Sequence, residues 1–213
     1  MQDIIIIGAG AFGREVKWLI ERINEANDEA QWNVLGFVDD GICKGTMIDG
    51  LSVLGGVDYL FDLAEPINLV CAVAGVKARE TIILKIIDKA NVSFPNLIDP
   101  SVIQSPSVQM GQGNIICASS ILSVDIKIED FVIIDWKCTV GHDAKLESFV
   151  TVYPGVNISG CVDVGVRCEL GTGTKIVQGL KISNDIVIGA GAVVVRDVSE
   201  SGTYVGIPVN RIK

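Results

Sequence analysis

The feature that most constrains this chain is an aliphatic residue that recurs every six positions between Met110 and Val194. A helix repeats its apolar face every 3.6 residues and a simple strand every 2, so neither explains this spacing. A sustained period of six is typical of the hexapeptide parallel β-helix, in which three hexads form one triangular coil. The chain therefore predicts a prism of stacked coils whose inward residues are Met110, Ile116, Leu122, Ile128, Ile134, Val140, Leu146, Val152, Ile158, Val164, Leu170, Ile176, Ile182, Ile188 and Val194.

The residue before each aliphatic position is expected to point outward, because side chains alternate between the two sides of a strand. Collecting one such residue per coil predicts three faces of the prism. The first is Ile115, Ile133, Thr151, Glu169 and Val187; the second is Ile121, Thr139, Asn157, Lys175 and Val193; the third is Gln109, Lys127, Lys145, Asp163 and Lys181. The third face is polar, whereas outward Ile and Val on the other two predict subunit contacts and a cyclic homotrimer.

The residues before the repeat predict a separate α/β domain over residues 1–97, with the β-helix over 98–213. An apolar run, 3–7, leads into the glycine turn 8–13 and then into an amphipathic helical pattern. A second predicted strand, 34–38, ends at Asp39 and Asp40, and a third, 68–74, ends at Gly75. A short helix is expected over 58–63, a longer one over 78–90, and a loop over 41–50. This order of elements, β-α-β-α-β, is half of a Rossmann fold.

The glycine turn predicts a phosphate site, since glycines let the backbone approach an anion at the N-terminus of a helix. A dinucleotide fold pairs two such halves, and only one fits before the repeat begins. We therefore expect a nucleotide or sugar nucleotide rather than NAD, and an NAD-dependent oxidoreductase would leave the repeat unexplained. A glycine turn that binds no ligand is the alternative.

The formal charge of −9 argues against nucleic acids and anionic membranes as main partners. Met1 leads directly into a strand and no apolar stretch of about 18 residues occurs, so we expect neither a signal peptide nor a spanning helix, and a cytoplasmic location. The six cysteines contain no CxxC pair, and Cys138 and Cys168 fall on inward positions of the repeat. Reduced structural thiols are the favoured interpretation.

His142 is the only histidine, and it lies in an outward turn beside Gly141 and Asp143. Histidine is the side chain best suited to accept a proton near neutral pH. A solvated surface residue is the alternative interpretation. A zinc hydrolase would need several histidine ligands, so we expect no catalytic metal.

Taken together, these motifs resemble the bacterial left-handed β-helix acetyltransferases of the sialic acid O-acetyltransferase and UDP-4-amino-sugar N-acetyltransferase type. The resemblance rests on the glycine-turn domain, Gly-Phe-Val-Asp-Asp, the hexapeptide coils, Val-Gly-His-Asp and the terminal Gly-Ile-Pro, and it covers essentially the whole chain. It implies a left-handed helix, a trimer with active sites shared between chains, and acetyl-CoA as co-substrate.

The resemblance also implies roles for particular residues. His142 is expected to be the general base and Asp143 the acid that raises its basicity. Acetyl-CoA is expected near Thr151, Thr172 and Ala190, and the nucleotide of the acceptor near Gly10, Ala11, Phe12, Asp39, Asp40 and Gly75. Thr151 stands where several members carry a second histidine; a threonine can still donate a hydrogen bond to the thioester carbonyl.

The expected function is transfer of acetyl from acetyl-CoA to the amino group of a nucleotide-linked amino sugar, with UDP as the expected nucleotide. Two alternatives remain open: O-acetylation of a sugar or sialic acid, and a trimeric nucleotide-binding scaffold without catalysis. The identity of the sugar and of the acyl chain is left open by the sequence.

Overall fold

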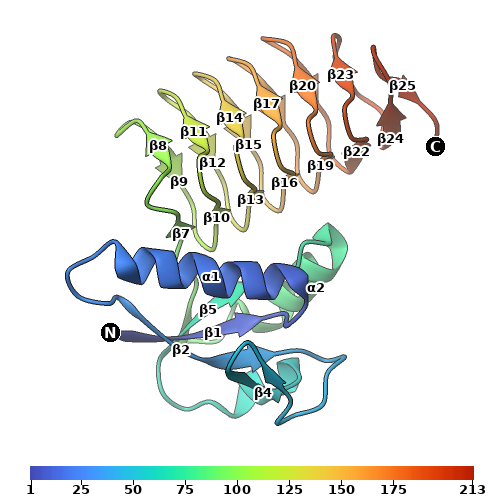
Figure 1. Cartoon of the computed structure of the whole chain (residues 1–213). Coiled ribbons are helices and arrows are strands. Elements are labelled where there is room, and N and C mark those ends of the chain that lie inside the picture. The colour runs from blue at the N-terminus through green and yellow to red at the C-terminus, as the bar shows by residue number, and fades with distance from the viewer. The chain divides into compact units, whose positions relative to one another are not determined.

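Two units make up the structure, a computed structural model that describes residues 1–213: an N-terminal unit, Met1–Pro100, and a C-terminal unit, Ser101–Lys213 (Figure 1). The fold class expected from the sequence is confirmed, an α/β domain followed by a left-handed parallel β-helix. Neither α-helix combines the length and the apolar character that crossing a bilayer would require.

The N-terminal unit is built on a six-stranded sheet of order β3-β4-β2-β1-β5-β6. Its central strand, β1, is buried from Ile4 to Ile7 and pairs in parallel with β2 and β5, which places their carboxyl ends at one edge. The elements of this unit are β1 (Gln2–Ile7), α1 (Ala11–Glu25), β2 (Trp32–Val38), β3 (Met47–Ile48), β4 (Leu51–Gly55), the 3-10 helix η1 (Val57–Asp62), β5 (Ile67–Cys71), α2 (Val76–Ile86), β6 (Val92–Ser93) and β7 (Leu97–Ile98).

One part of the N-terminal unit differs from the sequence-based expectation. The segment expected to be a loop, 41–50, contains β3, which forms an antiparallel hairpin with β4. Asp49 and Gly50 both have positive φ, 44° and 82°, as a two-residue hairpin turn requires. The Asp-Gly pair was the available signal. The sequence does not reveal the hairpin because β3 has only 2 residues, too few to show an alternating pattern.

The C-terminal unit is a triangular prism whose three sides are sheets of parallel strands, except that the last strand of the first face pairs antiparallel with its neighbour. The second face is β8 (Ile103–Gln104), β11 (Ile121–Leu122), β14 (Thr139–Val140), β17 (Asn157–Ile158), β20 (Lys175–Ile176) and β23 (Val193–Val194). The third is β9 (Gln109–Met110), β12 (Lys127–Ile128), β15 (Lys145–Leu146), β18 (Asp163–Val164) and β21 (Lys181–Ile182). The first contains β10 (Ile115–Ile116), β13 (Ile133–Ile134), β16 (Thr151–Val152), β19 (Glu169–Leu170), β22 (Ile186–Ile188), β24 (Gly202–Val205) and β25 (Asn210–Arg211).

The inward residues of the repeat form the core of the prism, as the sequence predicts. From Ile116 to Val194 each is at most 2% exposed, and only Met110, in the first coil, is partly open. Burying one such side chain contributes roughly 1.5–3 kcal/mol, so this column is the main source of the prism's stability. Two buried cysteines, Cys138 and Cys168, lie beside this column. Burial raises the pKa of each thiol to about 11, and each thiol donates a hydrogen bond to a backbone carbonyl.

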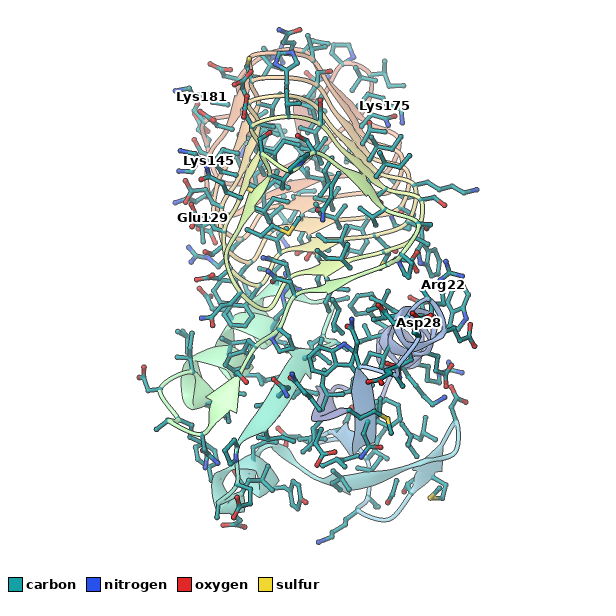
Figure 2. The ribbon with its side chains drawn as sticks, turned by 90° about the vertical axis from the view of Figure 1, so that its left-hand side faces the viewer. Arg22, Asp28, Glu129, Lys145, Lys175 and Lys181 are labelled. Atoms are coloured by element: carbon teal, nitrogen blue, oxygen red, sulfur yellow. The ribbon has the colours of Figure 1, made fainter.

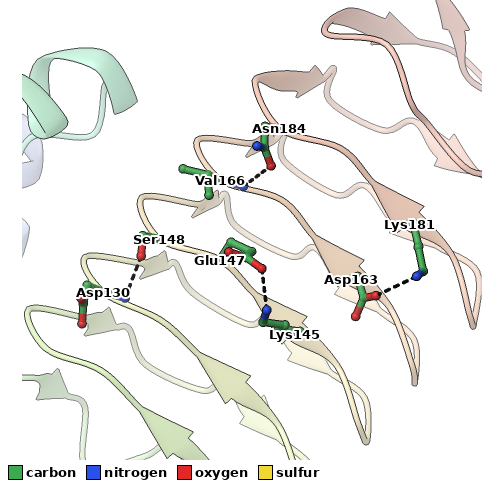
Figure 3. Close-up of polar contacts among 8 residues, drawn as sticks. All are labelled: Asp130, Lys145, Glu147, Ser148, Asp163, Val166, Lys181 and Asn184. Carbon is green, nitrogen blue, oxygen red and sulfur yellow. Dashed lines mark hydrogen bonds and ion pairs between the residues drawn. The ribbon is translucent and has the colours of Figure 1, made fainter.

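The third face is polar and solvated, as predicted. Figure 2 shows Lys145 and Lys181 along one side of the triangular coils and Lys175 on another. Ion pairs join Lys145 to Glu147 at 2.6 Å and Lys181 to Asp163 at 3.7 Å (Figure 3).

The first face is only partly open to a partner: its Val187 is 36% exposed, but its two isoleucines are not. Ile115 is fully buried and Ile133 is 2% exposed within this single chain. The second face keeps its apolar residues open: Ile103 is 65% and Ile121 43% exposed on neighbouring strands. Among the outward isoleucines of these two faces, only those on the second face are therefore open to a subunit contact.

Candidate functional site

His142 lies in the turn that joins β14 of the second face to β15 of the third. Two glycines let the coils pack closely here. A Cβ on Gly141 would lie 2.4 Å from the backbone nitrogen of Gly160, and a Cβ on Gly160 would lie 2.5 Å from Nε2 of His142. The imidazole ring therefore rests directly on the Gly160 backbone of the next coil, which fixes its orientation.

Asp143 holds the other side of the ring. Its Oδ2 is 2.8 Å from Nδ1 of His142, and the two side chains are 60% and 48% exposed. Asp143 has φ of 57°, and its amide donates to the carbonyl of Val124 in the preceding coil at 3.1 Å. Because a carboxylate only accepts hydrogen bonds, Nδ1 carries the proton and Nε2 presents its lone pair. This is the arrangement of an oriented proton acceptor.

Cys161 lies beside this pair, which the sequence analysis did not anticipate. Its Sγ is 4.0 Å from Nδ1 of His142, and its amide donates to the His142 carbonyl at 2.7 Å. His142, Asp143, Gly160 and Cys161 are called the His142 corner below. The signal that could have found them is the coil length of 18 residues. Gly160 lies one coil after His142, and Cys161 lies one coil after Asp143.

Thr172 and Ala190 come together at a different corner of the prism. Both are exposed in turns between the first and second faces, and the amide of Gly191 donates to the Thr172 carbonyl at 2.8 Å. Glycine is needed here too, because a Cβ on Gly171 would lie 2.7 Å from the nitrogen of Ala190. The His142 corner lies between the second and third faces, so one chain does not bring these residues beside His142.

Unlike Thr172 and Ala190, Thr151 is buried in this chain. It is 1% exposed, on β16 in the first face, half a coil away from His142 along the chain. The assignment of Thr151 to acetyl-CoA binding stays a prediction, with the side chain buried in the single chain. Periodicity predicts that a residue points outward, but it does not show what covers that residue.

The three glycines of the N-terminal turn have different roles. A Cβ on Gly13 would lie 2.0 Å from the Gly8 carbonyl oxygen, and one on Gly8 would lie 2.8 Å from that of Ala72, so both positions are needed for packing. Gly10 instead caps α1, and a Cβ there would meet nothing within 4 Å. Ala11 and Phe12 follow in the first turn, where backbone amides have no acceptor within the helix.

Asp39 and Asp40 hold the loops at the carboxyl ends of the strands. Asp39 accepts from the amides of Ala9 and Gly41, both at 2.8 Å, and Asp40 accepts from the amide of Val57 at 2.7 Å. Both acids line a cavity of 190 Å³ at this edge of the sheet, whose lining residues are Ile7, Gly8, Val38, Asp39, Asp40, Gly41, Val57, Val73 and Ile82.

Gly75 provides a second open helix N-terminus in this unit. It caps α2 without a side-chain hydrogen bond, and a Cβ there would meet nothing within 4 Å. Gly10, Ala11, Phe12 and Gly75 are not among the residues that line the cavity. The structure thus places the acids at the cavity and the glycine-capped helix ends outside its lining.

The comparisons with known proteins cover both units. Residues 3–86 match the family model of the PglD N-terminal domain. The acetyltransferase domain of PglB from Neisseria gonorrhoeae FA1090, solved in complex with acetyl coenzyme A, is 29% identical, with a TM-score of 0.88 and coverage of 99% of each chain. PerB from Caulobacter crescentus, solved with CoA and GDP-perosamine, is 29% identical, with a TM-score of 0.86 over 100% of this chain and 98% of that one.

The curated relatives match only part of the chain. Serine acetyltransferase from Mycobacterium tuberculosis is 38% identical over 77 residues, which are 32% of this chain and 34% of that relative. The chain thus spans about a third of that relative's length. The matches to PglB and PerB, in contrast, run through both units.

Proposed function

We propose that this chain is a hexapeptide-repeat sugar acetyltransferase of the left-handed β-helix type, which it resembles over both units. In this proposal it transfers acetyl from acetyl-CoA to the amino group of a nucleotide-linked amino sugar. The single observation that carries the proposal is the His142–Asp143 pair, 2.8 Å apart at an exposed corner of the coils. Further support comes from PglB, solved with acetyl coenzyme A, and PerB, solved with CoA and GDP-perosamine.

His142 serves as the general base in this proposal. Its Nε2 removes a proton as the amino nitrogen attacks the thioester carbonyl carbon; the C–S bond then breaks and CoA leaves as a thiolate, which takes up a proton. Asp143 keeps Nδ1 protonated and so holds the lone pair on Nε2, and it stabilises the imidazolium that forms. No covalent enzyme intermediate is required. A related perosamine N-acetyltransferase has been solved in variants that replace a histidine by asparagine or alanine.

The N-terminal unit binds the nucleotide of the acceptor. Its diphosphate lies at the N-terminus of α1, where the amides of Ala11 and Phe12 point outward and Gly10 leaves room for close approach. Asp39 and Asp40 retain acceptor capacity beside their loop contacts for sugar or base hydroxyls. Gly75 supplies a second set of helix amides. Uridine diphosphate is the expected nucleotide. Guanosine diphosphate is the alternative to test beside it, because PerB was solved with GDP-perosamine.

A homotrimer completes the acetyl-CoA site. Within one chain Thr172 and Ala190 lie at one corner of the prism and His142 at another, so a site containing all three needs two chains. In this proposal acetyl-CoA lies between neighbouring prisms, with Thr172 and Ala190 from one chain facing His142 of the next. The exposed Ile103 and Ile121 on the second face supply apolar surface for that contact.

Thiol release from acetyl-CoA tests the proposal. Wild-type protein is assayed with UDP- and GDP-linked amino sugars, the free sugars, sialic acid and serine, and the product is identified by mass and by stability to mild base. We expect turnover only with a nucleotide-linked amino sugar and a base-stable amide. A base-labile ester would support O-acetylation, turnover with serine would overturn the sugar assignment, and nucleotide binding without thiol release would support the scaffold.

A further inference from the structure

The His142 corner carries three potential metal ligands from two successive coils. Nδ1 of His142, a carboxylate oxygen of Asp143 and Sγ of Cys161 all lie within 4.8 Å of one another, and all three side chains are exposed. A nitrogen, an oxygen and a sulfur donor form a set that zinc accepts, whereas magnesium and calcium prefer oxygen alone. The acetyl-transfer mechanism uses the first two groups and has no role for the thiol.

The spacing of these donors fits a tetrahedral zinc ion. Zinc bonds of about 2.0–2.3 Å place neighbouring donor atoms roughly 3.3–3.6 Å apart. The observed distances from Nδ1 are 2.8 Å to Oδ2 of Asp143 and 4.0 Å to Sγ of Cys161, on either side of that value. Small side-chain rotations are therefore sufficient, and solvent can supply the fourth ligand because the corner is open.

The backbone around the ligands is held in place by the coils. Asp143 and Cys161 occupy the same position of successive turns, with φ of 57° and 58°. The amide of Asp143 donates to Val124, and that of Cys161 donates to His142. Only side-chain torsions have to change on metal binding, which lowers the cost of assembling the site.

Cys161 differs from the other cysteines of the chain. Cys71, Cys117, Cys138 and Cys168 are buried, and only Cys43 shares the exposure of Cys161. Cys43 belongs to the loop before β3 and is not part of any group of three potential metal ligands. It is therefore a matched control for an exposed thiol without neighbouring ligands.

We propose that the His142 corner binds Zn²⁺ through His142 Nδ1, Asp143 and Cys161 Sγ, and that this binding switches off the general base. The Cys161 thiol releases its proton to solvent as the sulfur–zinc bond forms. When the metal occupies Nδ1, the proton of the neutral imidazole must sit on Nε2, so the lone pair that removes the substrate proton is lost. The site rests on the geometry alone, whereas its inhibitory effect rests on the proposed function.

Binding is tested without turnover, on the full-length protein freed of thiol reductant. Calorimetry with ZnCl₂ is expected to show one ion per chain, and Co²⁺ in its place should give a thiolate-to-cobalt absorption band in the near ultraviolet. Cys161→Asn, which tolerates the left-handed backbone, should lose the band and weaken zinc binding at least tenfold, since even the loss of an outer-shell partner costs roughly 10–100-fold in metal affinity. Cys43→Ser should keep both.

The outcomes separate the two parts of the inference. Equal zinc affinity in wild type and Cys161→Asn, or an absent cobalt band in wild type, would overturn the site even if acetyl transfer is observed. A band that depends on Cys161 supports the site even if no acceptor is found.

Inhibition is measured as the zinc concentration that halves the acetyl-transfer rate. That concentration should rise at least tenfold in Cys161→Asn and stay constant in Cys43→Ser. Equal inhibition of all three proteins would overturn the switch.

Discussion

At the scale of single residues, the proposed chemistry depends on what holds His142. The ring has two neighbours: Asp143, bonded to Nδ1, and Gly160 of the next coil, where an added Cβ would lie 2.5–2.8 Å from three ring atoms. Asp143 sets which nitrogen carries the proton, and Gly160 sets where the lone pair points. The two contacts can be tested separately.

Removing the base tests the mechanism directly. His142→Ala should lower kcat by about 10²–10⁴-fold, the usual contribution of a general base. Asp143→Asn should lower kcat by a smaller factor than His142→Ala does. It should also shift the pH profile of kcat/KM, because an amide does not stabilise the imidazolium as a carboxylate does. Calorimetry with CoA should show unchanged binding in both variants. Near-normal turnover in His142→Ala would rule out this base.

Gly160→Ala tests the support of the ring. The added methyl would occupy the space of the imidazole, 2.5 Å from Nε2, and displace the ring. Since a misplacement of about 1 Å can cost 10²-fold, kcat should fall on that order while KM for acetyl-CoA stays constant. A parallel loss of melting temperature and of both kinetic constants would show instead that the change disturbs the coil.

At the scale of elements, the β-helix and the glycine turn contribute in different ways. In the prism an inward residue is enclosed on all sides, whereas an outward residue on the third face contacts water and a neighbouring charge. In the N-terminal turn two glycines serve packing and the third leaves open space. Position within the element therefore decides the effect of a substitution.

Two aspartate substitutions in the prism test that distinction. Ile158→Asp places a carboxylate in the core without a partner, at a cost of several kcal/mol, and should abolish soluble protein or lower its melting temperature sharply. Lys145→Asp loses only an exposed pair with Glu147 and should change the free energy of unfolding by about 1 kcal/mol or less. Similar stability of the two variants in urea would contradict the register.

Valine substitutions separate the glycines of the N-terminal turn. Gly10→Val should fold normally and raise KM for the sugar nucleotide roughly tenfold or more, the equivalent of one lost charge-assisted hydrogen bond. KM for acetyl-CoA should not change. Gly13→Val should fail to fold, because its Cβ would lie 2.0 Å from a carbonyl oxygen. An unchanged KM for the sugar nucleotide in Gly10→Val would show that its phosphates do not bind at this helix end.

At the scale of the whole molecule, the proposal needs a second chain, because the Thr172 corner and the His142 corner are different corners of one prism. The outward isoleucines available for that contact are on the second face, since Ile115 and Ile133 of the first face are buried.

Ile121→Lys tests the assembly. A lysine among the exposed apolar residues of the second face should prevent their burial between subunits, so sedimentation should report monomers and acetyl transfer should be lost. Lys127→Glu, on the polar third face, should leave the oligomeric state unchanged. An active Ile121→Lys monomer would contradict both the interface and the shared site.

The sequence alone determined the prism and its register. One aliphatic residue in every six can be buried only if the chain turns at that interval, so the inward column from Ile116 to Val194 followed from periodicity. The same logic indicated the half-Rossmann unit, where strand, glycine turn and helix follow one another directly. It also singled out His142 and Asp143, which are neighbours in the chain.

Only the tertiary structure decided which outward residues are open and which side chains meet across coils. Thr151 and Ile133 have outward positions like that of Ile121, yet the first two are buried and the third is exposed. Cys161 is 19 residues from His142, and its 4.0 Å approach depends on how one coil stacks on the next. Burial and contact are properties of the packed chain, because they depend on every segment that approaches a residue, whereas periodicity reports only the direction in which its side chain leaves the backbone.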